Sequence, residues 1–123
     1  MSKKLLIVDD DLYLRDLYKE ILTDAGYEVE TANDGREGLD KLNNGGYDLT
    51  LLDVMMPHMD GLGVLTKLHE TPPTAPNGPV VLLTNLAHDP VIKEALSKGA
   101  ASYLIKADLT PDQVVEKVKE YLK

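Results

Sequence analysis

The sequence predicts an α/β fold in which a doubly wound parallel sheet is covered by helices on both faces. Short apolar runs alternate along the chain with segments whose apolar residues recur at helical spacing. The runs are continuously apolar, which is typical of strands that are buried on both faces of a sheet. Right-handed crossovers between such strands place helices on both sides. The 123 residues suit one domain, residues 1–123, with five strand–helix pairs.

Five segments are predicted as strands from their apolar and β-branched content. The second is the weakest, because glutamates interrupt it. In chain order the predicted strands are Leu5–Val8, Glu28–Ala32, Tyr47–Leu52, Val80–Leu83 and Ala101–Ile105.

Five helices are predicted between and after these strands, because apolar residues recur three and four positions apart. Gly26 and Gly99 are typical helix stops. Asp89-Pro90 and Thr110-Pro111-Asp112-Gln113 have the cap and first-turn residues of helix starts. The residues expected on the buried faces are Leu14, Leu17, Tyr18, Ile21, Leu22 and Ala25; Leu39 and Leu42; Leu62, Leu65 and Leu68; Ile92, Ala95 and Leu96; and Val114, Val118, Tyr121 and Leu122.

Two loops stand out. Residues Thr71–Pro79 contain too many prolines for a helix or a central strand, and we expect a stiff surface loop. Residues Val54–Asp60 follow the third strand, and Met55, Met56 and Met59 are expected to pack around this loop.

Composition excludes several classes of function. The chain has no Cys, so a disulfide framework, a thiol nucleophile and a thiolate metal site are excluded. A formal net charge of −8 without a basic cluster argues against direct binding of nucleic acid or anionic lipid. No stretch has the length of a signal peptide core or a membrane span, which predicts a cytoplasmic protein without a membrane partner.

Four of the predicted strands end at residues suited to phosphate chemistry. Asp9 and Asp10 follow the first strand, Asp53 the third, Thr84 the fourth and Lys106 the fifth. Doubly wound sheets bind ligands beyond the carboxyl ends of their strands. We therefore expect three carboxylates, a hydroxyl and an ammonium to meet at one edge of the sheet.

The three carboxylates require a cation. Two carboxylates about 4 Å apart repel by roughly 4 kcal/mol at an effective dielectric constant near 20. Lys106 supplies one positive charge, and a divalent ion would supply more. Because the candidate ligands are hard oxygens, the set favours Mg²⁺, or else Mn²⁺. Asp53 stands alone at its strand end and is the best candidate for a carboxylate nucleophile toward phosphorus.

With these residues in place, the chain resembles the receiver domain of bacterial two-component response regulators, from Lys4 to Leu122. The matching motifs are Ile7–Asp10, Leu51–Gly61, Val80–Thr84 and Tyr103–Lys106. The resemblance implies the flavodoxin-like strand order 2-1-3-4-5. It also implies a signalling switch rather than an enzyme in the usual sense, acting alone or as a receiver excised from a longer regulator.

The resemblance implies roles for the acidic residues. Asp53 would accept a phosphoryl group from a phosphohistidine on a sensor histidine kinase or a histidine phosphotransfer protein. Asp10, Asp53 and the backbone carbonyl of Met55 would bind Mg²⁺ directly, and Asp9 would act mainly through a metal-bound water.

The resemblance also implies how the switch works. Thr84 and Lys106 would contact the phosphoryl group. Tyr103 matches the family's switch aromatic, which turns inward as Thr84 moves toward the phosphate. A downstream protein would then bind the face formed by the fourth helix, the fifth strand and the fifth helix. This is a population shift toward the state that coordinates the phosphoryl oxygens.

Several positions depart from the family's pattern. Ala107 stands where proline is usual, often after a cis bond, and we expect a trans bond or an altered loop here. Asn85 stands where a small residue is common, and its bulk could narrow access to Asp53. Met55 and Leu86 flank the family's water path and are both apolar, which predicts slow self-hydrolysis of the phosphoaspartate.

Two alternatives remain open at this point. Asp9-x-Asp11 after an apolar strand resembles the nucleophile motif of small Mg²⁺-dependent phosphohydrolases of the haloacid-dehalogenase type. The chain could also be an interaction module that keeps the fold without being phosphorylated.

Overall fold

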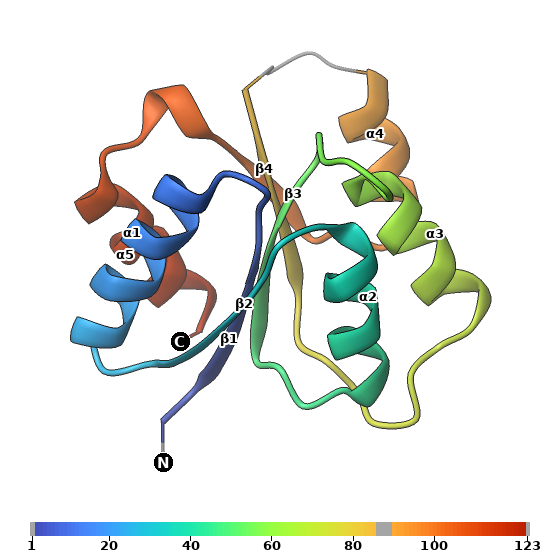
Figure 1. The fold of residues 1–123 in the computed structure, drawn as a ribbon, viewed down its shortest axis with the longest axis horizontal. Helices are drawn as coiled ribbons and strands as arrows, with labels where there is room; N and C mark the ends of the chain where they lie inside the picture. The colour runs from blue at the N-terminus through green and yellow to red at the C-terminus, as the bar shows by residue number, and fades with distance from the viewer. Residues whose placement is uncertain (1, 86–89, 123) are drawn as a thin grey trace.

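The computed structural model describes residues 2–85 and 90–122, and these form the predicted α/β architecture (Figure 1). Five parallel strands make one sheet in the order β2-β1-β3-β4-β5, which confirms the predicted fold class and strand order. The strands are β1 (Lys4–Val8), β2 (Glu28–Ala32), β3 (Leu49–Asp53), β4 (Val80–Thr84) and β5 (Ser102–Ile105).

Helices cover both faces of the sheet. Figure 1 shows one group of helices on one face and a second group on the other. The first group is α1 (Leu12–Asp24) and α5 (Pro111–Tyr121), and the second is α2 (Gly35–Asn44), α3 (Gly61–Glu70) and α4 (Pro90–Ser97). A short 3₁₀ turn, Lys106–Asp108, joins β5 to α5.

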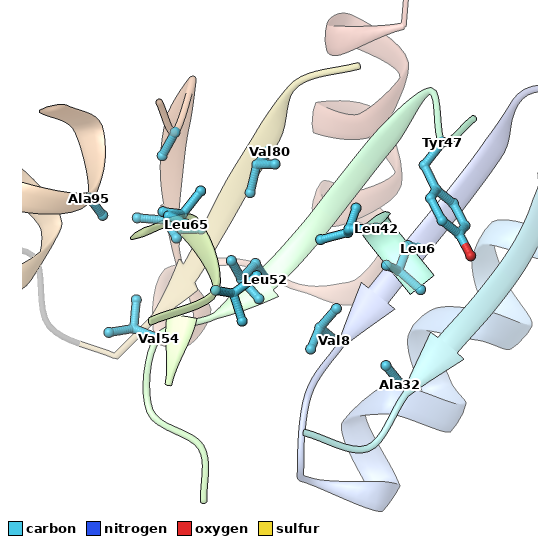
Figure 2. Close-up of a cluster of buried hydrophobic side chains, with 13 residues drawn as sticks. Leu6, Val8, Ala32, Leu42, Tyr47, Leu52, Val54, Leu65, Val80 and Ala95 are labelled. Atoms are coloured by element: carbon cyan, nitrogen blue, oxygen red, sulfur yellow. The ribbon is translucent and has the colours of Figure 1, made fainter. Parts of the chain in front are cut away.

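The core lies in two layers because successive strand residues point to opposite faces. Leu5 and Ile7 of β1 pack with side chains from α1 and α5. Leu6 and Val8 pack on the other face, where Figure 2 shows them near Leu52 of β3. All five of these side chains are fully buried. The sheet is therefore rigid at its centre, and rigid strands fix the direction of whatever follows their ends.

Side-chain caps set where several helices begin. The carboxylates of Asp11, Asp34 and Asp60 accept hydrogen bonds from the backbone amides three residues later, at 3.2, 2.9 and 2.7 Å. The predicted capping box at the start of α5 is present between Thr110 and Gln113. The cap predicted at Asp89 lies outside the described residues.

The proline-rich loop is anchored to the chain between α2 and β3. The Asn77 side chain accepts a hydrogen bond from the Tyr47 amide at 3.2 Å and donates one to the Leu42 carbonyl at 3.0 Å. The Gly78 amide donates to the Tyr47 carbonyl at 2.6 Å. These contacts confirm an irregular loop and place it at the amino ends of the strands, opposite the carboxyl ends.

Some predicted details were wrong. Ala25 caps the end of α1 and is exposed, because the helix ends before it. Leu96 is 39% exposed, whereas Ile92 and Ala95 are the buried residues of α4. The third strand begins at Leu49 and includes Asp53, although Tyr47 is still buried.

Within residues 2–85 and 90–122, no helix is long and apolar enough to cross a membrane.

Candidate functional site

Polar side chains from four strands converge at the carboxyl edge of the sheet. The chain runs from β1 outward to β2, then returns to β3 and continues to β4 and β5, so its winding reverses between β1 and β3. Asp9 follows β1 and Asp53 ends β3, which places both carboxylates at this switch point. Thr84 ends β4 and Lys106 follows β5. The predicted convergence is therefore present.

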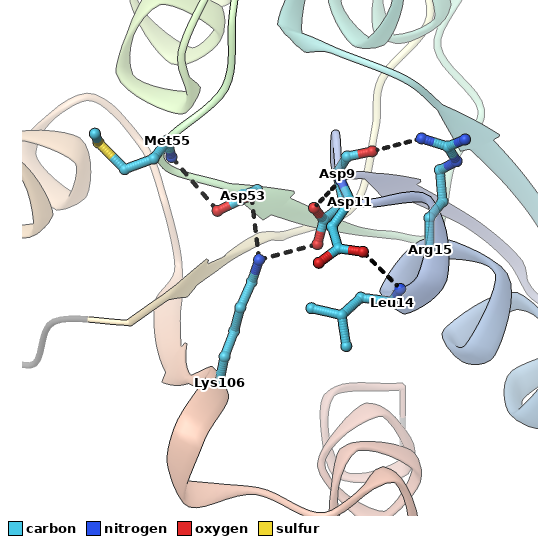
Figure 3. Close-up of polar contacts among 7 residues, drawn as sticks. All are labelled: Asp9, Asp11, Leu14, Arg15, Asp53, Met55 and Lys106. Carbon is cyan, nitrogen blue, oxygen red and sulfur yellow. Dashed lines mark hydrogen bonds and ion pairs between the residues drawn. The ribbon is translucent and has the colours of Figure 1, made fainter.

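Lys106 joins two of the carboxylates. Its ammonium Nζ lies 3.0 Å from Oδ2 of Asp9 and 3.1 Å from Oδ2 of Asp53 (Figure 3). The lysine side chain is largely buried, so these ion pairs are poorly screened by solvent. Burial by itself would lower the pKa of Lys106, but the hydrogen bonds and negative charges of Asp9 and Asp53 together outweigh it and raise the pKa. Lys106 is therefore positively charged at neutral pH.

Asp9 is the most completely bonded residue of the site. It is fully buried. Its Oδ1 accepts a hydrogen bond from the Asp11 amide at 2.9 Å, and its Oδ2 accepts one from Lys106. Its backbone amide donates to the Ala32 carbonyl at 3.2 Å, and its carbonyl accepts from Arg15 at 2.9 Å. Each polar atom of Asp9 thus has a protein partner.

Asp53 is held less tightly. Its side chain accepts one long hydrogen bond, from the Met55 amide to Oδ1 at 3.4 Å, in addition to the ion pair with Lys106. Burial raises the pKa of Asp53 from 3.8 to about 6, Lys106 opposes this rise, and the negative charge of Asp9 adds to it. The ionised form of Asp53 is therefore destabilised until a further cation arrives.

Asp10 completes a cluster of three carboxylates. One oxygen each from Asp9, Asp10 and Asp53 lies within 4.8 Å of the others. Asp10 itself is exposed, whereas Asp9 and Asp53 are buried. Asp10 lies at a bend of the backbone between β1 and α1, where both neighbouring aspartates contribute an oxygen to the cluster. Three carboxylates against one ammonium leave a surplus of negative charge, and the donor set is one of hard oxygens.

The cluster opens into a pocket of about 780 Å³. Thr84 is buried and lines the pocket beside the acidic residues, while Asn85 is exposed at its wall. Tyr103 is 38% exposed on β5 and does not line the pocket. The apolar part of the wall comes from Leu14, Leu17, Tyr18, Met55, Ala107, Leu109 and Pro111.

The sequence did not indicate that three further residues belong to the site. Arg15 is buried behind Asp9, and Tyr18, predicted only as a core residue, lines the pocket. A Cβ on Gly61 would lie 2.5 Å from the backbone oxygen of Asp53, so a side chain there would collide with the end of β3. The position of an arginine within an apolar helical stripe was the only available signal for Arg15.

The loop after Asp53 departs from prediction in one respect. Met56 and Met59 pack against the core as expected, but Met55 is 73% exposed and lines the acidic pocket instead of packing in the core. The described residues contain no cis peptide bond, so the bond before Ala107 is trans, one of the two outcomes expected there. Leu86, the other residue expected on the water path, lies outside the described residues.

Comparison with known proteins places the chain in one family. The model of the response regulator receiver domain matches residues 5–119. The chemotaxis protein CheY of Treponema pallidum is 37% identical over 123 residues, which cover 98% of this chain and 83% of that protein. The transcriptional regulatory protein SrrA of Staphylococcus aureus is 36% identical over the whole of this chain, which spans about half of SrrA, 49%.

Solved structures agree. A CheY-like receiver domain from Methanospirillum hungatei JF-1 has a TM-score of 0.86 and 37% identity, covering 99% of this chain and 94% of that one. The response regulator TrrA from Thermotoga maritima, solved in complex with Mg(2+)-BeF, has a TM-score of 0.80 and 37% identity, covering 98% and 99%. None of these findings favours the phosphohydrolase alternative. The five-stranded fold, the acidic pocket and the matched motifs together show that the chain belongs to the response regulator receiver domain family.

Proposed function

We propose that Asp53 accepts a phosphoryl group from a phosphohistidine on a sensor histidine kinase or a histidine phosphotransfer protein. The observation that carries this proposal is the placement of its carboxylate beside the Lys106 ammonium and in the cluster with Asp9 and Asp10, at the switch point of the sheet. We propose further that residues 1–123 act as one receiver domain whose surface changes after transfer.

The contacts of the two buried aspartates support Asp53 rather than Asp9 as the acceptor. Both carboxylate oxygens of Asp9 already accept hydrogen bonds, and the residue is fully buried. Asp53 has one oxygen with only a 3.4 Å hydrogen bond and is 6% exposed. A nucleophile needs a lone pair that can reach the phosphorus atom, which Asp53 offers and Asp9 does not. The same comparison argues against a phosphohydrolase that uses Asp9.

The donor set fits Mg²⁺, with Mn²⁺ as a substitute. Opposite ligands of an octahedral Mg²⁺ lie about 4 Å apart, and the three carboxylates already lie within 4.8 Å of one another. Asp10, Asp53 and the carbonyl of Met55 would hold the ion, and Asp9 would contact it through a water. When bound, the ion would neutralise charge on the transferring phosphoryl group. The Mg(2+)-BeF complex of TrrA supports this assignment.

The transfer itself needs positioning more than covalent help from the protein. A carboxylate oxygen of Asp53 forms a bond to phosphorus as the bond from phosphorus to the imidazole nitrogen breaks, and the electron pair of that bond stays on the imidazole. Lys106, already within 3.1 Å of Asp53, stabilises the negative oxygens of the phosphoryl group. Thr84, at the end of the neighbouring strand β4, would donate its hydroxyl hydrogen to one of them.

The output of the switch is proposed to lie on α4, β5 and α5. Tyr103 on β5 is the proposed switch aromatic, turning inward as Thr84 moves toward the phosphoryl group. Support comes from exposed apolar side chains on these elements, since Leu96 and Tyr103 are among the few large hydrophobic residues exposed in the described chain. The net charge of −8 favours a protein target over nucleic acid. The cytoplasmic location stays a prediction.

One labelling experiment tests the acceptor. The protein is incubated with Mg²⁺ and acetyl phosphate, and the modified residue is mapped by mass spectrometry. Label on Asp53 that disappears in Asp53→Asn and in the presence of EDTA is the expected result. Label on Asp9 with rapid turnover would support the phosphohydrolase instead, and absence of both label and Mg²⁺ binding would support an unphosphorylated module.

A further inference from the structure

We propose that Arg15 is a positioning residue of the acidic pocket, which acts through the backbone of Asp9 to orient Asp10 toward the metal. The inference rests on the proposed function, because it assigns Arg15 a part in Mg²⁺ binding. Arg15 contacts neither Asp53 nor Lys106 in the hydrogen bonds and ion pairs of the described chain, so its effect on the site is indirect.

Arg15 lies behind Asp9. Its side chain leaves α1 on the buried side, at the spacing of Tyr18 and Leu22, and the residue is only 9% exposed. Its Nη1 donates a hydrogen bond of 2.9 Å to the carbonyl oxygen of Asp9. Figure 3 shows the guanidinium on the opposite side of Asp9 from Lys106.

This contact fixes one particular peptide plane. The carbonyl of Asp9 belongs to the peptide that leads into Asp10, so holding that oxygen sets the direction in which the Asp10 side chain leaves the backbone. The other polar atoms of Asp9 are held by Ala32, Asp11 and Lys106. Arg15 supplies the remaining restraint, and it acts on the peptide that joins Asp9 to Asp10. Such supporting contacts tune ligand geometry and metal affinity.

A purely structural explanation is less satisfactory. Tyr18 and Leu22 on the same face of α1 pack in the core, and an apolar residue at position 15 would do so without burying a charge. Among the described residues, Arg15 forms no ion pair with a carboxylate. A buried cation next to an excess of carboxylates instead reduces the repulsion within the cluster. A role in supporting the acidic pocket explains why the buried charge of Arg15 is present despite its cost in folding free energy.

The test compares Mg²⁺ binding by wild type and Arg15→Met, which keeps a long unbranched side chain, shorter than that of arginine, and removes its charge and donors. Calorimetric titration with Mg²⁺ should show a dissociation constant about tenfold higher in the variant. The rate at which acetyl phosphate labels Asp53 should fall at low Mg²⁺ and recover most of the loss at saturating Mg²⁺. A change that only weakened the fold would not shift the Mg²⁺ concentration for half-maximal labelling.

Asn77→Ala is the matched control. It also removes a side-chain hydrogen bond to a backbone carbonyl, at the opposite edge of the sheet. It should lower the melting temperature while leaving the Mg²⁺ dissociation constant within twofold of wild type. A folded Arg15→Met with the Mg²⁺ affinity of wild type would overturn the inference. Where Arg15→Met does not fold, Arg15→Gln is judged by the same criterion. Wild type that neither binds Mg²⁺ nor labels on Asp53 would instead overturn the proposed function.

Discussion

Replacing Asp53 by Asn should stabilise the metal-free protein at neutral pH. Burial, with a contribution from the charge of Asp9, raises the pKa of Asp53 from 3.8 to about 6 despite the opposing effect of Lys106. Each pKa unit corresponds to about 1.4 kcal/mol, so keeping this carboxylate ionised costs about 3 kcal/mol of folding free energy. The variant also weakens one contact of Lys106, and we therefore expect a net gain of about 1–2 kcal/mol.

The sign of the effect can be tested through pH. A carboxyl group whose pKa is higher in the folded than in the unfolded chain binds its proton more tightly when folded. Its destabilising effect is absent below the unfolded pKa of 3.8 and complete above the folded pKa of about 6. The advantage of Asp53→Asn over wild type should therefore be largest above pH 6 and should shrink toward zero as the pH falls to 4.

The assay is urea unfolding of both proteins in EDTA at pH 7.5 and at pH 4. Asp40→Asn is the control, because it removes the same charge from an exposed position on α2 and should change stability by less than about 0.5 kcal/mol. Adding Mg²⁺ should stabilise wild type more than Asp53→Asn, because only wild type has the full set of ligands. The reasoning is wrong if Asp53→Asn is less stable than wild type at pH 7.5, or if its advantage is the same at both pH values.

Three further substitutions have definite expected outcomes. Thr50→Val should raise the free energy of unfolding in urea by about 1 kcal/mol, because the buried Thr50 hydroxyl has no hydrogen-bond partner among the described residues; a loss of stability would contradict this. Met55→Asn should speed loss of phosphate from Asp53 about tenfold, or about 1.4 kcal/mol, by giving an attacking water a polar partner beside the site; an unchanged rate of phosphate release would count against it. Gly61→Ala should lower stability by about 2 kcal/mol, because the added Cβ would lie 2.5 Å from a backbone oxygen. Gly63→Ala should not lower stability by this amount, because its Cβ would meet the flexible Met59 side chain. Equal urea midpoints for the two variants would refute the steric argument.

The fold and the polar edge could be predicted because both depend on regularities that a sequence displays. Continuous apolar runs such as Leu5–Val8 indicate strands covered on both faces, and parallel strands bring their carboxyl ends to one edge. Asp9, Asp53 and Lys106 could therefore be placed together although almost the whole chain separates the first from the last. The strand order required the family resemblance, since periodicity does not say which strands are neighbours.

What could not be predicted depends on tertiary contacts of single side chains. An arginine in a helix usually extends its charge into solvent, and only the position of the Asp9 carbonyl explains why Arg15 is buried. Met55 and Leu96 are apolar and were assigned to packed positions, yet both are exposed. Apolar side chains remain on every protein surface, so hydrophobicity alone does not decide burial at the edge of a helical stripe or in a loop.

The acidic pocket persists because the rigid strands around it hold the aspartates close together despite their mutual repulsion. Both side-chain oxygens of Asp9 are held at 3.0 Å or less, whereas the side chain of Asp53 is held by Lys106 and one long hydrogen bond. The fully buried residues of β1 and β3 prevent these strands from separating to relieve the repulsion between the two aspartates. That repulsion must then be relieved by binding a proton, a metal ion or a positively charged partner. The destabilised carboxylate of Asp53 thus explains in physical terms how this fold can serve as a switch that responds to phosphoryl transfer.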